Sequence, residues 1–222
     1  KNKFIFADVS ESLTIKAAID KVIAESGRID LLVTSAGMGV SGAIEFIEEE
    51  EMKRQFEVNL LGTINTVKAV LPQMRKQKRG RIICISSVAA VYSIPFQAYY
   101  SASKAAINSF VDALTNEVKS FGIEVTSVMP GDISTGFTAA RIKSNAGDDV
   151  YSGVIGSAVS AMEKDEKNGM TPDSVARLVV KLAEKKHVAP LYTAGLQYKT
   201  LVFLSRLLPH KLAVKVVGGM YK

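Results

Sequence analysis

The stretch RIICISSVAAVYSIPFQAYYSASK at residues 81–104 decides the fold class that we predict for this chain. Residues 81–85 are nearly continuous in apolar, β-branched side chains, which is typical of a parallel strand covered on both faces. A helix is predicted over about 98–121, ending at Gly122, and a further strand over 123–129. We therefore predict a strand-helix-strand unit in which the first strand is central and parallel.

Outside this stretch, short β-rich runs alternate with longer helical patterns, which indicates further units of the same kind. Thr171-Pro172-Asp173 supplies the N-cap, first-turn proline and first-turn acid of another helix. The alternation predicts an α/β fold with a doubly wound parallel sheet. The other predicted elements are strands at 4–6 and 29–33 and helices at 12–26 and 48–77.

The composition favours a single globular domain over residues 1–222, because 47% of the residues are hydrophobic and 23% are charged. The formal net charge is +6, and no acidic residue follows Glu184. Cys84 is the only cysteine and lies in an apolar run, which predicts a buried, inert thiol in a reducing compartment. His187 and His210 stand at no metal-ligand spacing, so no metal site is predicted.

No apolar segment approaches the roughly 18 residues that cross a bilayer, and no cleavable signal is visible at the start. We expect a cytoplasmic protein, or one that is peripheral to a membrane. Nucleic-acid binding is not expected, because the basic residues lack an interleaved aromatic platform.

Residues 132–170 are rich in Gly, Ser, Asp and Asn and have weak hydrophobic periodicity. Long segments of this kind within compact domains often carry binding residues. We predict a mobile lid over a substrate site, with an ordinary surface excursion as the alternative.

Tyr100 and Lys104 are four residues apart on the helix predicted over 98–121, so they share one face. A free phenol has a pKa of about 10, and an adjacent cation stabilises the phenolate and lowers that value. Such a tyrosine can act as a general acid or base. Ser86 and Ser87 follow the central strand, at the sheet edge where open parallel sheets bind ligands.

Together these residues resemble the active-site pattern of the short-chain dehydrogenases/reductases. Ser87 takes the position of the serine that hydrogen-bonds the substrate oxygen, and Tyr100 that of the proton-exchanging tyrosine. Lys104 matches the lysine that lowers the phenol pKa and binds the nicotinamide ribose. Asn59, in a Glu-Val-Asn-Leu-Leu-Gly motif, matches the asparagine that completes a proton relay. Tyr99 has Ser103 rather than a lysine four residues later, so we assign it to packing.

The resemblance also implies a Rossmann-like fold and a nicotinamide cofactor, NADP(H) or NAD(H), with NADP(H) slightly favoured. Thr34-Ser35 replaces both asparagines of the family's Asn-Asn-Ala-Gly motif. The implied cofactor contacts come from Asp8-Val9 after the first predicted strand, from that motif, from the helix that carries Tyr100 and Lys104, and from a turn after the strand at 123–129. They are Asp8, Val9, Ser35, Ala36, Gly37, Tyr100, Lys104, Pro130, Gly131, Ile133 and Thr135.

The family's opening strand, glycine-rich turn, helix and second strand have no counterpart before Lys1, and no glycine precedes Gly27. In the strand order 3-2-1-4-5-6, strands 1 and 2 lie between the first predicted strand and the next one. We therefore expect the fold to lack its first strand-helix-strand unit in this sequence. Our hypothesis is that upstream residues exist in the protein.

Residues 195–222 form a basic, amphipathic segment. Leu201, Leu204 and Leu208 fall at helical spacing, and this segment is interpreted as a C-terminal helix that covers an apolar pocket. The alternative is peripheral membrane contact through the apolar face and nearby cations. Both interpretations suit a lipophilic alcohol or ketone as substrate. The remaining residues of this pattern are Lys199, Phe203, Arg206, Leu207, Lys211 and Lys215.

The leading prediction is therefore an NAD(P)-dependent oxidoreductase that interconverts a hydroxyl and a carbonyl, and that assembles as a homodimer or homotetramer through its two long helices. A catalytically silent relative that senses dinucleotides or binds partners is the alternative. An epimerase or dehydratase using the same tyrosine and lysine is a third option. The spacing of Ser87 favours a simple dehydrogenase.

Overall fold

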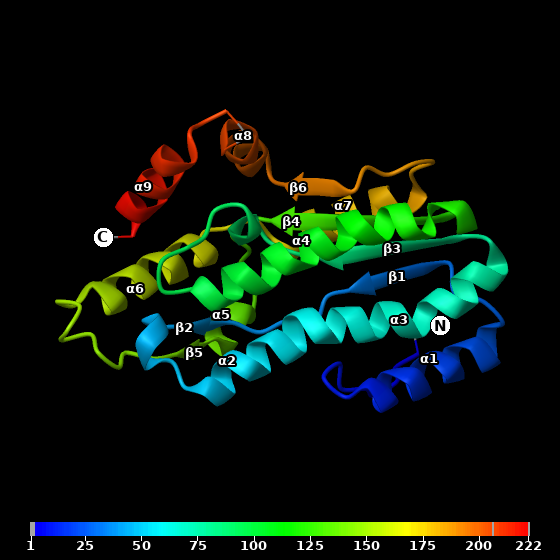
Figure 1. Ribbon diagram of the computed structural model, residues 1–222. Coiled ribbons are helices and arrows are strands. Elements are labelled where there is room, and N and C mark those ends of the chain that lie inside the picture. The colour runs from blue at the N-terminus through cyan, green and yellow to red at the C-terminus, as the bar shows by residue number, and fades with distance from the viewer. Residues whose placement is uncertain (1–2, 206, 222) are drawn as a thin grey trace.

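The computed structural model describes residues 3–205 and 207–221 and shows a parallel sheet between helical layers (Figure 1). The four strands pair in the order β1-β3-β4-β6. The predicted α/β fold with a doubly wound parallel sheet is confirmed, and so are the three strands predicted after residue 28. β6 is a strand that the sequence patterns did not reveal. The strands are β1 (Leu31–Thr34), β3 (Gly80–Ile85), β4 (Ile123–Pro130) and β6 (Leu191–Ala194).

The strand predicted at residues 4–6 is absent from the described structure. Phe4 and Phe6 are 96% and 94% exposed, and no strand is assigned there. An apolar, β-rich run becomes a strand only where another backbone offers hydrogen bonds, and within residues 3–205 and 207–221 none pairs with it. The outer edge of β1 is likewise open among the described residues.

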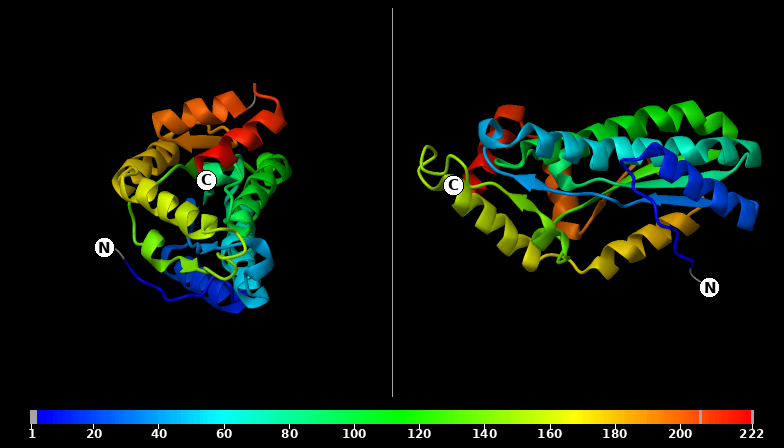
Figure 2. Two further views of the ribbon diagram at one scale, coloured as in Figure 1. Left: turned by 90° about the vertical axis from the view of Figure 1, so that its left-hand side faces the viewer. Right: turned by 90° about the horizontal axis from the view of Figure 1, so that it is seen from below.

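Helices cover both faces of the sheet, as the right-hand view in Figure 2 shows. Ile82 and Cys84 point from β3 into a core shared with α3 and α4, whereas Ile83 points into a second core shared with α7. This alternation explains why the run in β3 is apolar on both faces. Burial raises the pKa of the Cys84 thiol to about 11, which agrees with the predicted inert thiol. The helices flanking the sheet are α1 (Ser12–Ser26), α3 (Gly62–Gln77), α4 (Ala98–Val118) and α7 (Pro172–Glu184).

The helix predicted at 48–77 is one continuous rod with a local irregularity. It begins as α2 (Glu49–Phe56), passes through a π-helical segment at Glu57–Leu61, and continues as α3. π-helical turns inside helices occur frequently at functional sites. The segment here contains Asn59, whose side chain is fully buried.

The segment at 132–170 is more ordered than its composition predicts. It contains α5 (Phe137–Ala140), a strand β5 (Ile142–Lys143) paired with β2 (Val40–Ser41), and α6 (Val154–Lys167). The expectation of weak periodicity is wrong for α6, because Ile155, Ala158, Val159 and Met162 are buried along one helical face. The polar loop residues before α6 masked this short apolar stripe.

The C-terminal segment forms two helices rather than one. α8 (Leu196–Ser205) and α9 (His210–Met220) fold back over the end of the sheet where α6 also lies (Figures 1 and 2). Pro209 is the N-cap of α9 and cannot donate a main-chain hydrogen bond, so it suits a helix start. Arg206, one of the predicted basic residues, lies outside the described residues.

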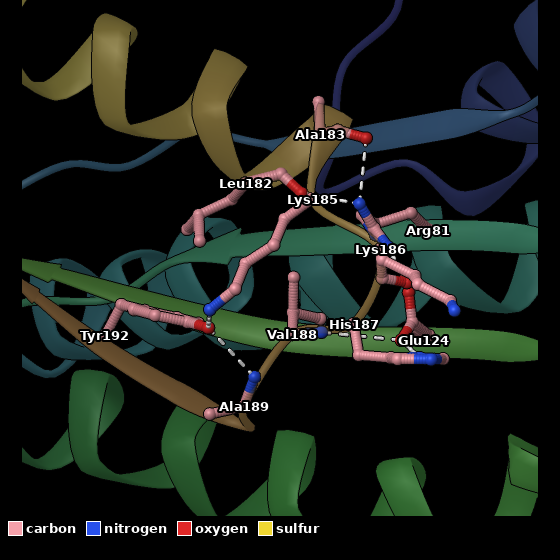
Figure 3. A network of polar contacts seen from close by, with 10 residues as sticks. All are labelled: Arg81, Glu124, Leu182, Ala183, Lys185, Lys186, His187, Val188, Ala189 and Tyr192. Carbon is pink, nitrogen blue, oxygen red and sulfur yellow. Dashed lines mark hydrogen bonds and ion pairs between the residues drawn. The ribbon is translucent and has the colours of Figure 1, made fainter.

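A polar network closes the opposite end of the sheet (Figure 3). Arg81 of β3 donates from Nη1 to the carbonyl oxygens of Leu182 at 2.6 Å and Ala183 at 2.8 Å, at the end of α7. Arg81 also pairs with Glu124 of β4, which in turn contacts His187 Nδ1 at 3.1 Å. These contacts cap the carbonyl end of α7 and join it to two strands.

Candidate active site

Ser86 and Ser87 leave the carboxyl end of β3 in different directions. Ser86 is buried, and its hydroxyl donates to the main-chain carbonyl of Lys104 at 3.0 Å. Ser87 caps a short turn by accepting a hydrogen bond from the main-chain nitrogen of Ala89 at 3.1 Å, and it lines a cavity. Ser86 lines the same cavity, but its hydroxyl proton is already donated to the protein, so Ser87 is the better placed of the two to donate to a ligand.

α4 brings Tyr100 and Lys104 to the same cavity. Lys104 Nζ lies 5.7 Å from the centre of the Tyr100 ring and donates to the carbonyl of Ile85 at 3.0 Å. The Tyr100 ring also contacts Phe137 of α5, with 5.7 Å between ring centres. Tyr99 points elsewhere, and its hydroxyl donates to the Ile44 carbonyl at 3.3 Å.

Burial shifts the titration of both groups toward their neutral forms. It raises the pKa of Tyr100 to about 12, an effect that a hydrogen bond with Ser87 opposes. Burial also lowers the pKa of Lys104 to about 8. The expected lowering of the phenol pKa by Lys104 is therefore not seen in this structure. Desolvation is the largest cause of the raised Tyr100 pKa.

Asn59 lies behind Lys104 and holds the loop after β1. Its Oδ1 accepts from the Met38 nitrogen at 2.8 Å, and its Nδ2 donates to the Met38 carbonyl at 3.0 Å and to Ser103 Oγ at 3.1 Å. Gly37 fits between these groups, since a Cβ there would lie 3.4 Å from Asn59 Oδ1 and 3.6 Å from Lys104 Nζ. The loop, the asparagine and the lysine thus form one packed unit.

The cavity has a volume of about 230 Å³ and lies at the carboxyl edge of the sheet. Most of the predicted site residues line it, although they come from four separate regions of the chain. The predicted residues among its lining are Ser35, Gly37, Ser87, Tyr100, Lys104, Pro130, Gly131, Ile133 and Thr135.

Four predicted residues are not part of this lining. Asn59 is buried behind it, and Ala36 lies between two lining residues. Asp8 accepts hydrogen bonds from the nitrogen and hydroxyl of Ser10 at 2.9 and 2.6 Å, and these bonds lower its pKa. Val9 packs against Gly62, where a Cβ would lie 2.7 Å from a Val9 methyl group. The structure therefore holds Asp8 and Val9 outside the cavity.

Several cavity residues escaped the sequence analysis. Asp132 lies within the predicted turn at 130–135, and burial raises its pKa. Glu166 of α6 reaches the cavity, accepts from Thr138 Oγ1 at 2.6 Å and pairs with the buried Arg141. The sequence offered a signal for Asp132 alone, through its position beside Gly131 in the predicted turn. The pairing of Arg141 with Glu166 could not be predicted, because no local pattern links the two residues.

A family model described as short chain dehydrogenase matches residues 1–146. The chain belongs to this family. It is therefore an oxidoreductase of the short-chain type, as the arrangement of Ser87, Tyr100 and Lys104 led us to expect. Within residues 3–205 and 207–221, no helix is long and apolar enough to span a bilayer.

Two curated relatives illustrate the range of similarity. The chain is 41% identical over 189 residues to a 3-ketodihydrosphingosine reductase of Bacteroides thetaiotaomicron, covering 84% of this chain and 70% of that protein. It is 32% identical over 209 residues to the dehydrogenase/reductase SDR family member 7B of Xenopus laevis. That match covers 94% of this chain and 61% of the relative, so this chain spans between three fifths and three quarters of these proteins.

Two solved structures share the fold. A short-chain dehydrogenase from Streptomyces avermitilis superposes with a TM-score of 0.77 at 27% identity, covering 91% of this chain and 75% of that chain. A gluconate 5-dehydrogenase from Burkholderia cenocepacia, in complex with NADP and tartrate, gives a TM-score of 0.70 at 25% identity. The second match covers 87% of this chain and 73% of that chain.

Proposed function

We propose that this protein is an NAD(P)-dependent oxidoreductase that interconverts a hydroxyl and a carbonyl on a lipophilic small molecule. The observation that carries the proposal is the convergence of Ser87, Tyr100 and Lys104 on one cavity at the carboxyl edge of the sheet. This edge is where open parallel sheets bind ligands.

Tyr100 acts as the proton donor during reduction. With its pKa raised to about 12, the phenol keeps its proton at neutral pH and gives it to the substrate oxygen as the carbonyl is reduced. Ser87 donates a hydrogen bond to the same oxygen and orients it. Lys104 stabilises the phenolate that forms, and Asn59 positions the loop and completes the proton relay.

The residues around the cavity fit a nicotinamide dinucleotide. Lys104 offers a buried ammonium for ribose hydroxyls, Gly37 leaves room between Asn59 and Lys104, and residues of the turn at 130–135 line the same cavity. The bound dinucleotide would supply or accept the hydride. NADP(H) is slightly favoured over NAD(H), and Asp8, Val9, Ser35 and Ala36 complete the proposed contacts.

Apolar side chains support a lipophilic substrate. Val88, Ile94, Ile133 and Phe137 line the cavity beside the polar groups. The name of the Bacteroides relative, a 3-ketodihydrosphingosine reductase, agrees with a ketone on a lipid-like molecule. The segment at 132–170 serves as the substrate lid, since it contributes Phe137 and Glu166 to the cavity.

The proposed setting is cytoplasmic, with the protein as a homodimer or homotetramer and peripheral membrane contact through α8 and α9. Phe203 of α8 and Leu207, between the two helices, are exposed. Lys199, Lys211 and Lys215 supply positive charge for anionic lipids. Sedimentation with anionic vesicles at low and high salt tests the contact, which requires salt-sensitive binding.

The decisive experiment compares Tyr100→Phe with Tyr99→Phe in the full-length protein, following cofactor absorbance with apolar ketones and both cofactors. We expect Tyr100→Phe to lower the rate at least about 100-fold, the lower range for general acid catalysis, and Tyr99→Phe to leave it near the wild-type value. An equal fall in both variants, or unchanged turnover in Tyr100→Phe, would refute the proposed chemistry.

A further inference from the structure

A second cavity, of about 240 Å³, adjoins the active-site cavity beneath α8 and α9. Val88, Ile94 and Asp132 line both cavities, so the two are neighbours along the loop after β3 and the turn after β4. We call this second cavity the tail chamber. Asp165 of α6 adds a second carboxylate to the lining. Most of the remaining walls are aliphatic and come from the two C-terminal helices and the segment between them, through Leu201, Leu204, Leu208, Val216, Val217 and Met220.

Two of the three phenols that line the tail chamber, those of Tyr92 and Tyr198, have their hydroxyls engaged. Tyr198 donates to Asp132 Oδ2 at 2.6 Å, and Tyr92 donates to the Leu201 carbonyl. Their rings therefore present apolar faces, and the Tyr92 contact ties α8 to the loop after β3. Along the aliphatic walls a polar ligand chain would lose its hydration without gaining a hydrogen bond, so these walls favour a hydrocarbon.

Tyr198 fixes the tail chamber relative to the active site. Its ring packs so closely on Gly131 that a Cβ there would lie 2.2 Å away, and a Cβ on Gly195 would lie 2.8 Å from it. Because Gly131 lies in the turn that lines the active-site cavity, the start of α8 is held against that turn. The chamber is thus held in a fixed position next to the active-site cavity.

We propose that the tail chamber binds the hydrocarbon chain of the substrate, while the reacting carbon lies beside Tyr100 and Ser87. The chain passes Val88 and Ile94, which line both cavities. This inference rests on the proposed oxidoreductase function and assigns to it a substrate with an unbranched, uncharged tail. Each buried methylene contributes about 0.8 kcal/mol, or about fourfold in affinity.

The test uses the full-length protein, a matched pair of tryptophan variants and two readouts. Ala213→Trp fills the chamber, since Ala213 lines it, whereas Val214→Trp places the same ring on the neighbouring, exposed position of α9. Turnover is measured with straight-chain methyl ketones from pentanone to tridecanone. Binding of radiolabelled dodecanol is measured separately by equilibrium dialysis, which requires no catalysis.

We expect kcat/KM of the wild type to rise about fourfold per methylene until the chamber is full. Ala213→Trp should end this rise at shorter chains, leave pentanone turnover unchanged and weaken dodecanol binding at least about tenfold, since more than two methylenes lose their contacts. Val214→Trp should match the wild type. These results together support the chamber as the tail site.

Other outcomes separate the two proposals. If no ketone is turned over but dodecanol binds to the wild type and not to Ala213→Trp, the tail site stands and the oxidoreductase function fails. If dodecanol does not bind to the wild type, or binds equally to Ala213→Trp, the tail site is overturned. A uniform fall in turnover for all chain lengths in Ala213→Trp also overturns it.

Discussion

The ammonium of Lys104 donates to the main-chain carbonyl of Ile85 at 3.0 Å, joining the catalytic helix to the end of the central strand. One turn of α4 separates Lys104 from Tyr100, and Ile85 is the last residue of β3. The bond fixes where the cation stands relative to the cavity. The hydrogen bond requires the Lys104 ammonium to be buried, and the free-energy cost of burying this charge can be measured.

Lys104→Met should change the pH dependence of stability. The pKa of Lys104 is lowered from 10.5 to about 8, so between these values the unfolded chain holds a proton that the native protein has released. The free energy of unfolding of the wild type should therefore rise with pH across this window, as far as Lys104 contributes. Below it, the full cost of the buried charge is present, on the order of 3 kcal/mol as an upper bound.

Chemical denaturation of wild type and Lys104→Met from about pH 7 to about pH 11, a range that includes this window, checks the prediction. The advantage of the methionine variant should be largest at the lower pH and should shrink as the pH rises. The lost hydrogen bond to Ile85 lowers the stability of the variant but does not create this slope. A difference that is constant with pH would contradict the prediction.

Asn59→Ala should destabilise the protein strongly. The buried amide satisfies both main-chain groups of Met38 and contacts Ser103, so its removal leaves buried polar groups unpaired. Such groups cost about 1–3 kcal/mol each, and we expect a total loss of about 2–4 kcal/mol. Asn65→Ala, at a half-buried position of α3, is the control and should change stability far less. Equal losses in the two variants, measured by urea unfolding, would count against the assigned role.

Gly131→Ala should disturb the contact between the turn after β4 and α8. The new methyl group would lie 2.2 Å from the Tyr198 ring, whereas a methyl group on Gly136 meets nothing within 4 Å. We expect a loss of about 1–3 kcal/mol from overpacking in Gly131→Ala and little change in Gly136→Ala. Thermal unfolding measures the stability of both variants. In a protein that already carries Tyr198→Ala, Gly131→Ala should change the stability very little. Independent, additive effects of the two substitutions would argue against direct packing.

Glu166→Gln should reveal the buried ion pair of the lid segment. Arg141 has a side chain that is 1% exposed and pairs with Glu166. The substitution therefore leaves a buried guanidinium without its ion-pair partner. Breaking a buried pair costs about 3–5 kcal/mol. Asp20→Asn breaks the exposed pair with Lys16 and should cost less than about 1 kcal/mol. Similar small effects of both substitutions on urea unfolding would show that the buried pair is not needed for stability.

Local patterns were sufficient where the structure depends on neighbours in sequence. The β-branched run of β3 requires burial on both faces, and the four-residue spacing of Tyr100 and Lys104 places them on one face of α4. Thr171-Pro172 likewise marks the start of α7, because Pro172 suits the first helical position. The roles proposed for these residues remain predictions until the variants are measured.

Patterns failed where the outcome depends on a distant partner. Residues 4–6 have strand-like composition, but a strand also needs a second backbone, which no described segment provides. The apolar stripe of α6 is too short to stand out from the polar loop before it. The C-terminal stripe continues through the break between α8 and α9, so spacing alone predicted one helix.

The sequence by itself determined the α/β alternation, the central parallel strand and the family, because periodicity and a short motif are local properties of the chain. Only the tertiary structure decided the tail chamber, the pairing of Arg141 with Glu166 and the shifts that raise the pKa of Tyr100 and lower that of Lys104. Burial and contact between distant segments set these features, and they exist only after the chain has closed on itself.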